Sequence, residues 1–138
     1  RQFATAADQV LLVTTPETTS ITDAYSTIKA LATSDCPPLD IVVNQAESAS
    51  QAKAIAARLQ QTSKMFLKKS VGYVGHVSRD SAVASAVAKR KPFVVENANC
   101  PAATDIHQLA RRVISTGGSL RTFRSYFDRF GTQKQRAA

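Results

Sequence analysis

Three short runs of apolar residues along the chain predict the strands of a sheet, at residues 10–15, 41–43 and 71–75. In each run the apolar residues are consecutive instead of alternating, which is typical of strands covered on both faces in a parallel sheet. Phe-Val-Val at 93–95 predicts a short further strand. We therefore expect an α/β fold with a mostly parallel sheet of three to four strands.

Helical patterns, with apolar residues every three or four positions, separate these runs. Ser20 is the predicted N-cap of the first helix, and the second covers about 47–67, with Phe66 among its apolar positions. Ser78 or Asp80 opens a third helix. Strand and helix alternating at this spacing predict right-handed βαβ units with helices flanking the sheet.

A fourth helix is predicted from Pro101 to about residue 114, and the sequence changes character after it. Gly117 and Gly118 form a predicted hinge, so we divide the chain into 1–116 and 117–138. The pattern after the hinge predicts a cationic amphipathic helix. Its apolar side carries Leu120, Phe123, Tyr126, Phe127 and Phe130, and its basic side includes Arg121 and Arg124.

Composition and charge narrow the class of protein. The chain has 138 residues, 43% of them hydrophobic, which fits one folded domain and excludes a disordered chain. Residues 1–63 carry a net charge of −2 (4 basic, 6 acidic) and residues 64–138 a net charge of +10 (14 basic, 4 acidic). An anionic partner is therefore expected to bind the second half. Two cysteines, Cys36 and Cys100, are too few for a disulfide framework, which favours a cytoplasmic protein.

Motifs for catalysis are absent from these 138 residues. There is no Gly-x-x-x-x-Gly-Lys-Ser/Thr phosphate loop, no Gly-x-Ser-x-Gly elbow, and no pair of histidines at metal-ligand spacing. Gly72 and Gly75 lie inside a strand pattern, where close backbone packing explains them better than phosphate binding does. The residues alone predict neither a catalytic residue nor a metal ligand.

Four stretches in this order, at 6–17, 21–29, 42–45 and 75–80, resemble the C-terminal half of a MinD/ParA-type P-loop ATPase, most nearly the FlhG-like flagellar-number regulators. They include Thr-Thr-Pro-Glu after the first strand, Val-Val-Asn-Gln at the end of the second, and Gly-His-Val-Ser-Arg-Asp after the third. The resemblance covers roughly residues 6–114. It implies that 1–116 is the C-terminal portion of the ATPase domain, a partial P-loop NTPase fold.

The resemblance also implies an activity for the parent protein. Such proteins bind ATP and magnesium, hydrolyse ATP, and control flagellar number or cell positioning by ATP-dependent dimerisation and membrane association. The phosphate loop, both switch segments and the catalytic aspartate of the family precede the matched region. We therefore expect this chain to bind no cofactor tightly and to be inactive alone.

Four residues are candidates for holding the nucleotide base: Asn44, His76, Val77 and Ser78. The resemblance assigns Asn44 to the adenine, and an amide at the carboxyl end of a parallel strand offers both a donor and an acceptor for it. The alternative is that Asn44 only forms a turn. The family commonly has proline where Ser78 stands. Asp80 is as well suited to capping a helix as to touching a ligand.

The expected partners follow from the resemblance and the charge. They are a second copy of the chain, flagellar-assembly proteins, and an anionic membrane surface at the inner face of the membrane. The membrane contact is assigned to Leu120, Arg121, Phe123, Arg124, Phe127 and Phe130, although an amphipathic helix packing on its own domain stays an alternative. The competing function is a basic nucleic-acid-binding or adaptor α/β domain without ATPase activity. The edge of the strand at 10–15 is expected to be bare and to recruit a partner.

Overall fold

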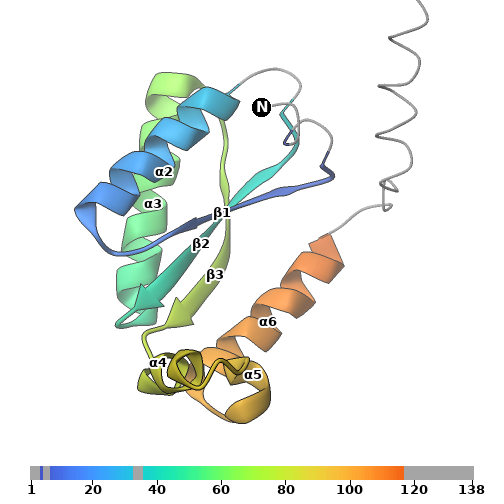
Figure 1. Ribbon diagram of the computed structural model, residues 1–138. Helices are drawn as coiled ribbons and strands as arrows, with labels where there is room; N and C mark the ends of the chain where they lie inside the picture. Colours follow the sequence, from blue (N-terminus) through green and yellow to red (C-terminus); the bar gives the residue numbers. More distant parts are fainter. Residues whose placement is uncertain (1–3, 5–6, 33–35, 117–138) are drawn as a thin grey trace, which may run out of the picture.

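The computed structural model describes residue 4 and residues 7–32 and 36–116, which form one α/β unit (Figure 1). Its elements in chain order are β1 (Val10–Thr14), α2 (Thr18–Leu31), β2 (Leu39–Ala46), α3 (Ala49–Leu67), β3 (Gly72–Ser78), α4 (Ser81–Ala88), α5 (Phe93–Glu96) and α6 (Pro101–Thr116).

The three strands form a fully parallel sheet in the order β1-β2-β3. Leu12 is in register with Ile41, and Ile41 with Tyr73. The parallel α/β sheet predicted from the apolar runs is therefore confirmed, with three strands. Within the described residues β1 is an edge strand, because it pairs with β2 alone.

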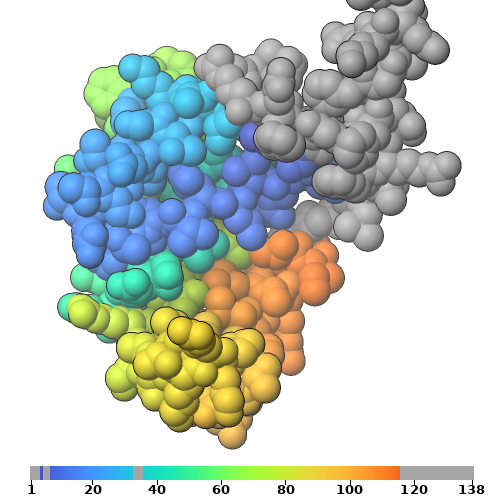
Figure 2. All heavy atoms as spheres, viewed as in Figure 1, coloured from blue at the N-terminus to red at the C-terminus, as the bar shows by residue number. Residues whose placement is uncertain are grey.

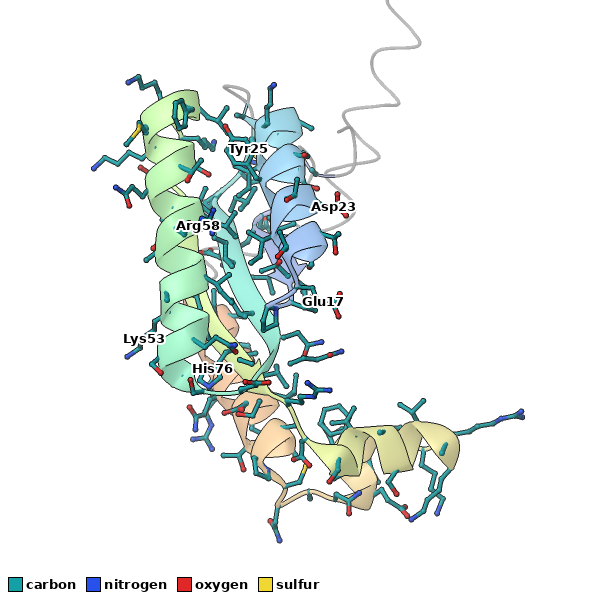
Figure 3. All side chains as sticks on the ribbon, turned by 90° about the vertical axis from the view of Figure 1, so that its left-hand side faces the viewer. Glu17, Asp23, Tyr25, Lys53, Arg58 and His76 are labelled. Atoms are coloured by element: carbon teal, nitrogen blue, oxygen red, sulfur yellow. The ribbon has the colours of Figure 1, made fainter. Side chains whose placement is uncertain are left out.

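Helices α2 and α3 cover one face of the sheet (Figure 1). They pack against the side chains of β2 that point to that face, and these residues form the larger of two apolar cores. Its members with almost no exposed surface include Ile28, Ile41, Val43, Ala52 and Ala56. Both helices run antiparallel to the strands, so that their last turns lie side by side at the amino end of the sheet (Figures 1 and 3).

The opposite face is covered by α6, which docks on β3. Three contacts set its direction. Asp105 near the start of α6 binds Ser78 at the end of β3, Leu109 lies over Gly75, and Arg112 Nη1 donates to the carbonyl oxygen of Val74 at 2.6 Å. The helix therefore runs antiparallel to β3, and it ends toward the amino end of the sheet.

This second cover does not extend over β1. Leu11 and Val13 point to the same face as α6, yet their exposed fractions are 42% and 58%. The space-filling view shows β1 at the surface, between α2 and α6 (Figure 2). Strands of parallel sheets are normally buried on both faces, so this corner of the sheet is the part of the fold that lacks its usual covering among the described residues.

Two bulges change which side chains face α6. Val74 is an extra residue opposite the Ile41–Val42 pair, so both Val74 and Gly75 point toward α6. Further along, β2 has one more residue than β3 between Val43 and Ala46, and Gln45 there has a positive φ of 56°. A bulge turns successive side chains to one face and often lies next to a functional site.

Phe93–Glu96 form the short helix α5, so the prediction of a strand at 93–95 is wrong. Pro92 precedes the first turn with φ of −63°, and Phe93 packs against the second apolar core, between the sheet and α6. The buried residues of this core are Val42, Val74, Val77, Ala102 and Leu109. Glu96 then binds Lys89 and Lys91 at 3.2 Å each. These contacts outweigh the strand preference of two valines.

Ser20 is not the N-cap of α2. The helix begins at Thr18, with Glu17 in the cap position. The Ser20 hydroxyl lies 3.0 Å from Thr14 Oγ1 and accepts a hydrogen bond from the Thr15 N–H at 2.9 Å, so it fastens the helix to the end of β1. Asp80, one of the two predicted caps of α4, does accept from the Ala82 N–H.

The predicted hinge and helix at 117–138 lie outside the described residues. Among the helices that are described, none has the length and apolar character needed to cross a bilayer.

Candidate functional site at the carboxyl edge of the sheet

A mainly apolar cavity of about 940 Å³ lies between the sheet, α4 and α6. The strands contribute its floor, α6 one wall, and α4 with Phe93 the far end. The lining residues are Leu11, Val13, Val42, Asn44, Gln45, Val77, Ser78, Arg79, Asp80, Val83, Ala84, Val87, Phe93, Ile106, Leu109, Ala110, Val113 and Ile114. Its polar members, Asn44, Gln45 and residues 78–80, gather at the carboxyl ends of β2 and β3.

Asn44 and Gln45 are brought to this cavity by the second bulge. Val43 before them points into the α2–α3 core and Ala46 after them does the same, whereas both bulge residues line the cavity. Asn44 Oδ1 accepts from the Gln45 N–H at 2.9 Å, which fixes the orientation of the amide. Within the described part of the chain, the Nδ2 group makes no hydrogen bond, so it can donate to a ligand.

Ser78 is held by Asp105 of α6. One carboxylate oxygen, Oδ2, accepts from the Ser78 N–H at 2.9 Å and from its hydroxyl at 2.6 Å. Because the hydroxyl hydrogen is used in this bond, the lone pairs of Oγ are left as acceptors. Val77, buried beside Ser78, contributes an apolar side chain to the same cavity.

Asp80 connects the beginnings of two helices. One carboxylate oxygen accepts from the Ala82 N–H of α4 at 2.9 Å and the other from the Ala102 N–H of α6 at 3.2 Å. The hydrogen bond from Ala82, followed by that from Ala102, lowers the pKa of Asp80 below its ordinary value. A carboxylate at two helix N-termini is also stabilised by both helix dipoles. Asp80 therefore fixes one end of the cavity.

His76 does not line this cavity. After the first bulge, His76 points to the face covered by α3, and it lies beside the beginning of that helix (Figure 3). Of the four candidate base-holding residues, the structure thus brings together Asn44, Val77 and Ser78 and separates His76 from them. Simple alternation from Val71 would put His76 on the α6 face, and the extra residue Val74 reverses that.

The other predicted site residues lie outside the described residues: Leu120, Arg121, Phe123, Arg124, Phe127 and Phe130. Within residues 7–32 and 36–116, no three side chains of the histidine, cysteine or carboxylate type come together as a metal site.

Sequence reasoning missed Gln45 and Asp105. Gln45 reaches the cavity through a bulge with a positive φ, and no pattern of apolar residues signals this. Asp105 lies 27 positions after the serine that it holds, on a helix whose apolar stripe was recognised. A carboxylate one turn into a helix could have been assigned to a neighbouring strand end only once the docking of α6 was known.

Comparison with known proteins gives one relative in sequence. The chain is 37% identical over 90 residues to the antiactivator FleN of Pseudomonas aeruginosa, a match that covers 64% of this chain and 32% of FleN. No family model matches the chain.

Two solved structures share the fold. The cell division ATPase MinD of Pyrococcus furiosus aligns with a TM-score of 0.62 at 19% identity, over 79% of this chain and 43% of that protein. The MinD cell division protein of Aquifex aeolicus aligns with a TM-score of 0.60 at 25% identity, over 85% of this chain and 47% of that protein. The chain thus spans about a third of FleN and less than half of each MinD structure. In sequence and in fold, it is similar to part of the MinD/ParA-type P-loop ATPases, and its relative FleN is of the FlhG-like kind.

Proposed function

We propose that this chain supplies the base-holding side of an adenine-nucleotide site in a FleN-like regulator of flagellar number. The observation that supports this most is the convergence of Asn44 and Ser78 at the carboxyl edge of a parallel sheet, beside an apolar cavity. Ligands of open α/β sheets bind at this edge. A protein similar in sequence, FleN, is named an antiactivator, and we extend that class of role to this chain.

The residues fit a purine base. Asn44 Nδ2 can donate to a ring nitrogen, and Ser78 Oγ, whose hydrogen is bound to Asp105, can accept from an exocyclic amine. Val77 offers an apolar surface on which a base can lie. The described residues offer neither a phosphate loop nor a cluster of metal ligands, so magnesium and the phosphates of ATP would have to be held by other residues. ATP would supply the energy for the switch between two states of the parent protein.

Nucleotide binding by the chain tests this proposal. We expect a fluorescent ADP analogue to bind weakly and saturably, and ADP to displace it. Asn44→Ala removes one donor, and the loss of about 1 kcal/mol for one hydrogen bond corresponds to about fivefold weaker binding. Asn99→Ala, at an exposed position away from the cavity, is the matched control. Equal affinity of the two variants, or no saturable binding by the wild-type chain, contradicts the proposal.

Dimerisation and membrane association are the regulatory part of the proposal. The edge of β1 that pairs with no strand among the described residues, together with the exposed side chains of Leu11 and Val13, supports pairing with a second copy. The amphipathic pattern at 119–131 supports contact with an anionic membrane at the inner face, which would make the protein cytoplasmic and peripheral. Sedimentation velocity over a range of concentrations tests the first, and a strictly monomeric profile contradicts it. Co-sedimentation with anionic vesicles tests the second.

A second candidate function is nucleic-acid binding without ATPase activity. The observation that favours it is the net charge of +10 on residues 64–138. Binding to DNA through such charge would weaken steeply with added salt, because it depends on the release of counterions. Duplex-DNA binding that survives Leu120→Ser/Phe123→Ser, with no vesicle binding by the wild-type chain, would favour this candidate.

A further inference from the structure

The last turn of α3 carries two large apolar side chains that the described residues leave uncovered. Met65 is 54% exposed and Phe66 is 69% exposed. Phe66 stands seven residues after the buried Leu59, and two turns of helix bring it back to the same side of α3. It therefore continues the apolar stripe of α3 past the end of the core.

The helix ends directly after these residues. Lys68 is the C-cap, with a positive φ of 53°, and the N–H groups of Lys68 and Lys69 both donate to the Ser63 carbonyl oxygen. Leu67 turns back and packs against the α2–α3 core. The tight ending holds Met65 and Phe66 at a corner of the molecule instead of leading the chain over them.

Lysines lie near the two apolar side chains in the sequence and on the neighbouring helix. Lys64 precedes them and Lys68 follows them, both exposed, and Lys29 lies in the last turn of α2 alongside. Lys69 donates to the Cys36 carbonyl oxygen at 3.4 Å and so connects this corner to the segment before β2. We call Lys64, Met65, Phe66 and Lys68 the α3 corner.

We propose that the α3 corner is a second membrane-contacting element, which inserts Met65 and Phe66 among the headgroups of an anionic bilayer while its lysines bind lipid phosphates. This inference rests on the membrane association proposed above. Exposed aromatic and apolar side chains next to lysines match the interface of such a membrane, where the apolar groups leave water and the charges stay hydrated. Contact with nucleic-acid phosphates would use the lysines but would leave Phe66 and Met65 in water.

The position of the corner supports a shared role with the C-terminal segment. The last turns of α2 and α3 lie at the amino end of the sheet, and α6, which runs antiparallel to β3, also ends toward it. The 22 residues that follow Thr116 thus start toward the same end of the sheet as the α3 corner, from the helix that covers the opposite face (Figure 1). One weak membrane element alone gives marginal binding, and two elements of one chain that reach the same bilayer strengthen binding through effective concentration. The candidate nucleotide residues are at the other end of the sheet, turned away from the lipid.

The test measures the partition of the full chain into phosphatidylcholine vesicles with and without phosphatidylglycerol. We expect Met65→Ser/Phe66→Ser to weaken partition at least tenfold, since two exposed apolar groups lose their burial. Lys64→Gln/Lys68→Gln should weaken it about fivefold per lysine at low salt, and less in high salt. Two matched controls should bind like wild type: Val95→Ser, at a 77% exposed position on α5, and Lys53→Gln at the opposite end of α3 (Figure 3).

The outcomes separate this inference from the proposal on which it rests. Phe123→Ser/Phe127→Ser tests the C-terminal segment in the same assay. If this variant loses binding and the Met65/Phe66 variant does not, the proposed membrane contact of the α3 corner is overturned and the proposed membrane association of the C-terminal segment stands. The reverse result supports the α3 corner and removes the assignment to the C-terminal segment. If the wild-type chain does not bind anionic vesicles, both are overturned.

A probe at position 66 shows directly what the corner touches. With Cys36 and Cys100 replaced by serine, Phe66→Cys carries an environment-sensitive dye. The emission should shift to the blue with anionic vesicles and be quenched by lipids labelled in the upper acyl chain. A shift with duplex DNA and none with vesicles would overturn the inference in favour of nucleic acid.

Discussion

The close contact between β3 and α6 at Gly75 leads to a quantitative prediction for Gly75→Ala. A Cβ at this position would lie 2.9 Å from Leu109 Cδ2 and 3.2 Å from Arg112 Nη1. The φ of Gly75 is +156°, a conformation that side chains rarely adopt. The substitution therefore combines backbone strain with a clash against a side chain in the second apolar core.

The magnitude follows from these two contributions. Backbone strain at such a position costs about 1–3 kcal/mol, and overpacking costs a similar amount, about 1–3 kcal/mol. We expect Gly75→Ala to lower the free energy of unfolding by about 2–6 kcal/mol, the sum of the two. The total for a domain of this size is about 7–20 kcal/mol, so the variant should still fold and show a measurable transition.

Urea unfolding followed by circular dichroism measures this loss, and a double-mutant cycle identifies its cause. Leu109→Ala removes the atom that the new Cβ would meet. The double variant should then be less destabilised than the sum of the single variants by about 1 kcal/mol or more. As control, Leu59→Ala on the other face of the sheet should add its effect to that of Gly75→Ala. Additivity of Gly75→Ala and Leu109→Ala within about 0.5 kcal/mol would refute the reasoning.

Three further predictions concern the candidate site and the uncovered face. Asp105→Ala should lower the free energy of unfolding in urea by about 1–3 kcal/mol, and by more than Ser78→Ala does, because only Asp105→Ala leaves the Ser78 N–H without its acceptor. A larger loss for Ser78→Ala would contradict the described geometry. Since the pKa of Asp80 is lowered in the folded state, its carboxylate stabilises the fold fully above the ordinary carboxyl pKa of about 3.9, and this stabilisation is lost as the pH falls through the lower folded-state pKa. Asp80→Asn should therefore reduce the fall of the melting temperature at acid pH. An unchanged fall would count against the two helix contacts. Leu11→Ser/Val13→Ser should reduce self-association in sedimentation velocity without lowering the helical circular dichroism signal, and undiminished association would exclude this face as the contact.

Most of the fold could be predicted from the sequence, because strands buried on both faces and helices with apolar stripes leave clear periodic signals. The strand predicted at 10–15 corresponds to β1, and the helix predicted at 47–67 corresponds to α3. The strand predicted at 93–95 was wrong, since its conformation is decided by Pro92 and by packing under α6. Ser20 was wrong as an N-cap because its hydroxyl binds the end of β1 instead.

The candidate site was predictable only in part. The carboxyl ends of β2 and β3 were recognised, and Asn44 and Ser78 do lie there. Bulges decide which of the two helix layers a residue near a strand end faces. They turn His76 toward α3 and place Gln45 at the cavity. Such insertions of one residue have little signature in hydrophobicity. The exposure of Phe66 could not be predicted either. The sequence placed Phe66 on the apolar stripe of α3, but it did not show that the core ends before this residue.

The side of β1 that the described residues leave uncovered has a thermodynamic consequence for the chain in a cell. A molecule that covered Leu11 and Val13 would bind only the folded form, so its binding free energy would add to the stability of that form by mass action. A melting temperature measured on the isolated chain would then be a lower limit and would rise with the concentration of such a molecule. Where such a molecule is scarce, a larger fraction of the chain would be unfolded and open to chaperones and proteases. The cellular level of the chain would then depend on the level of the molecule that covers it.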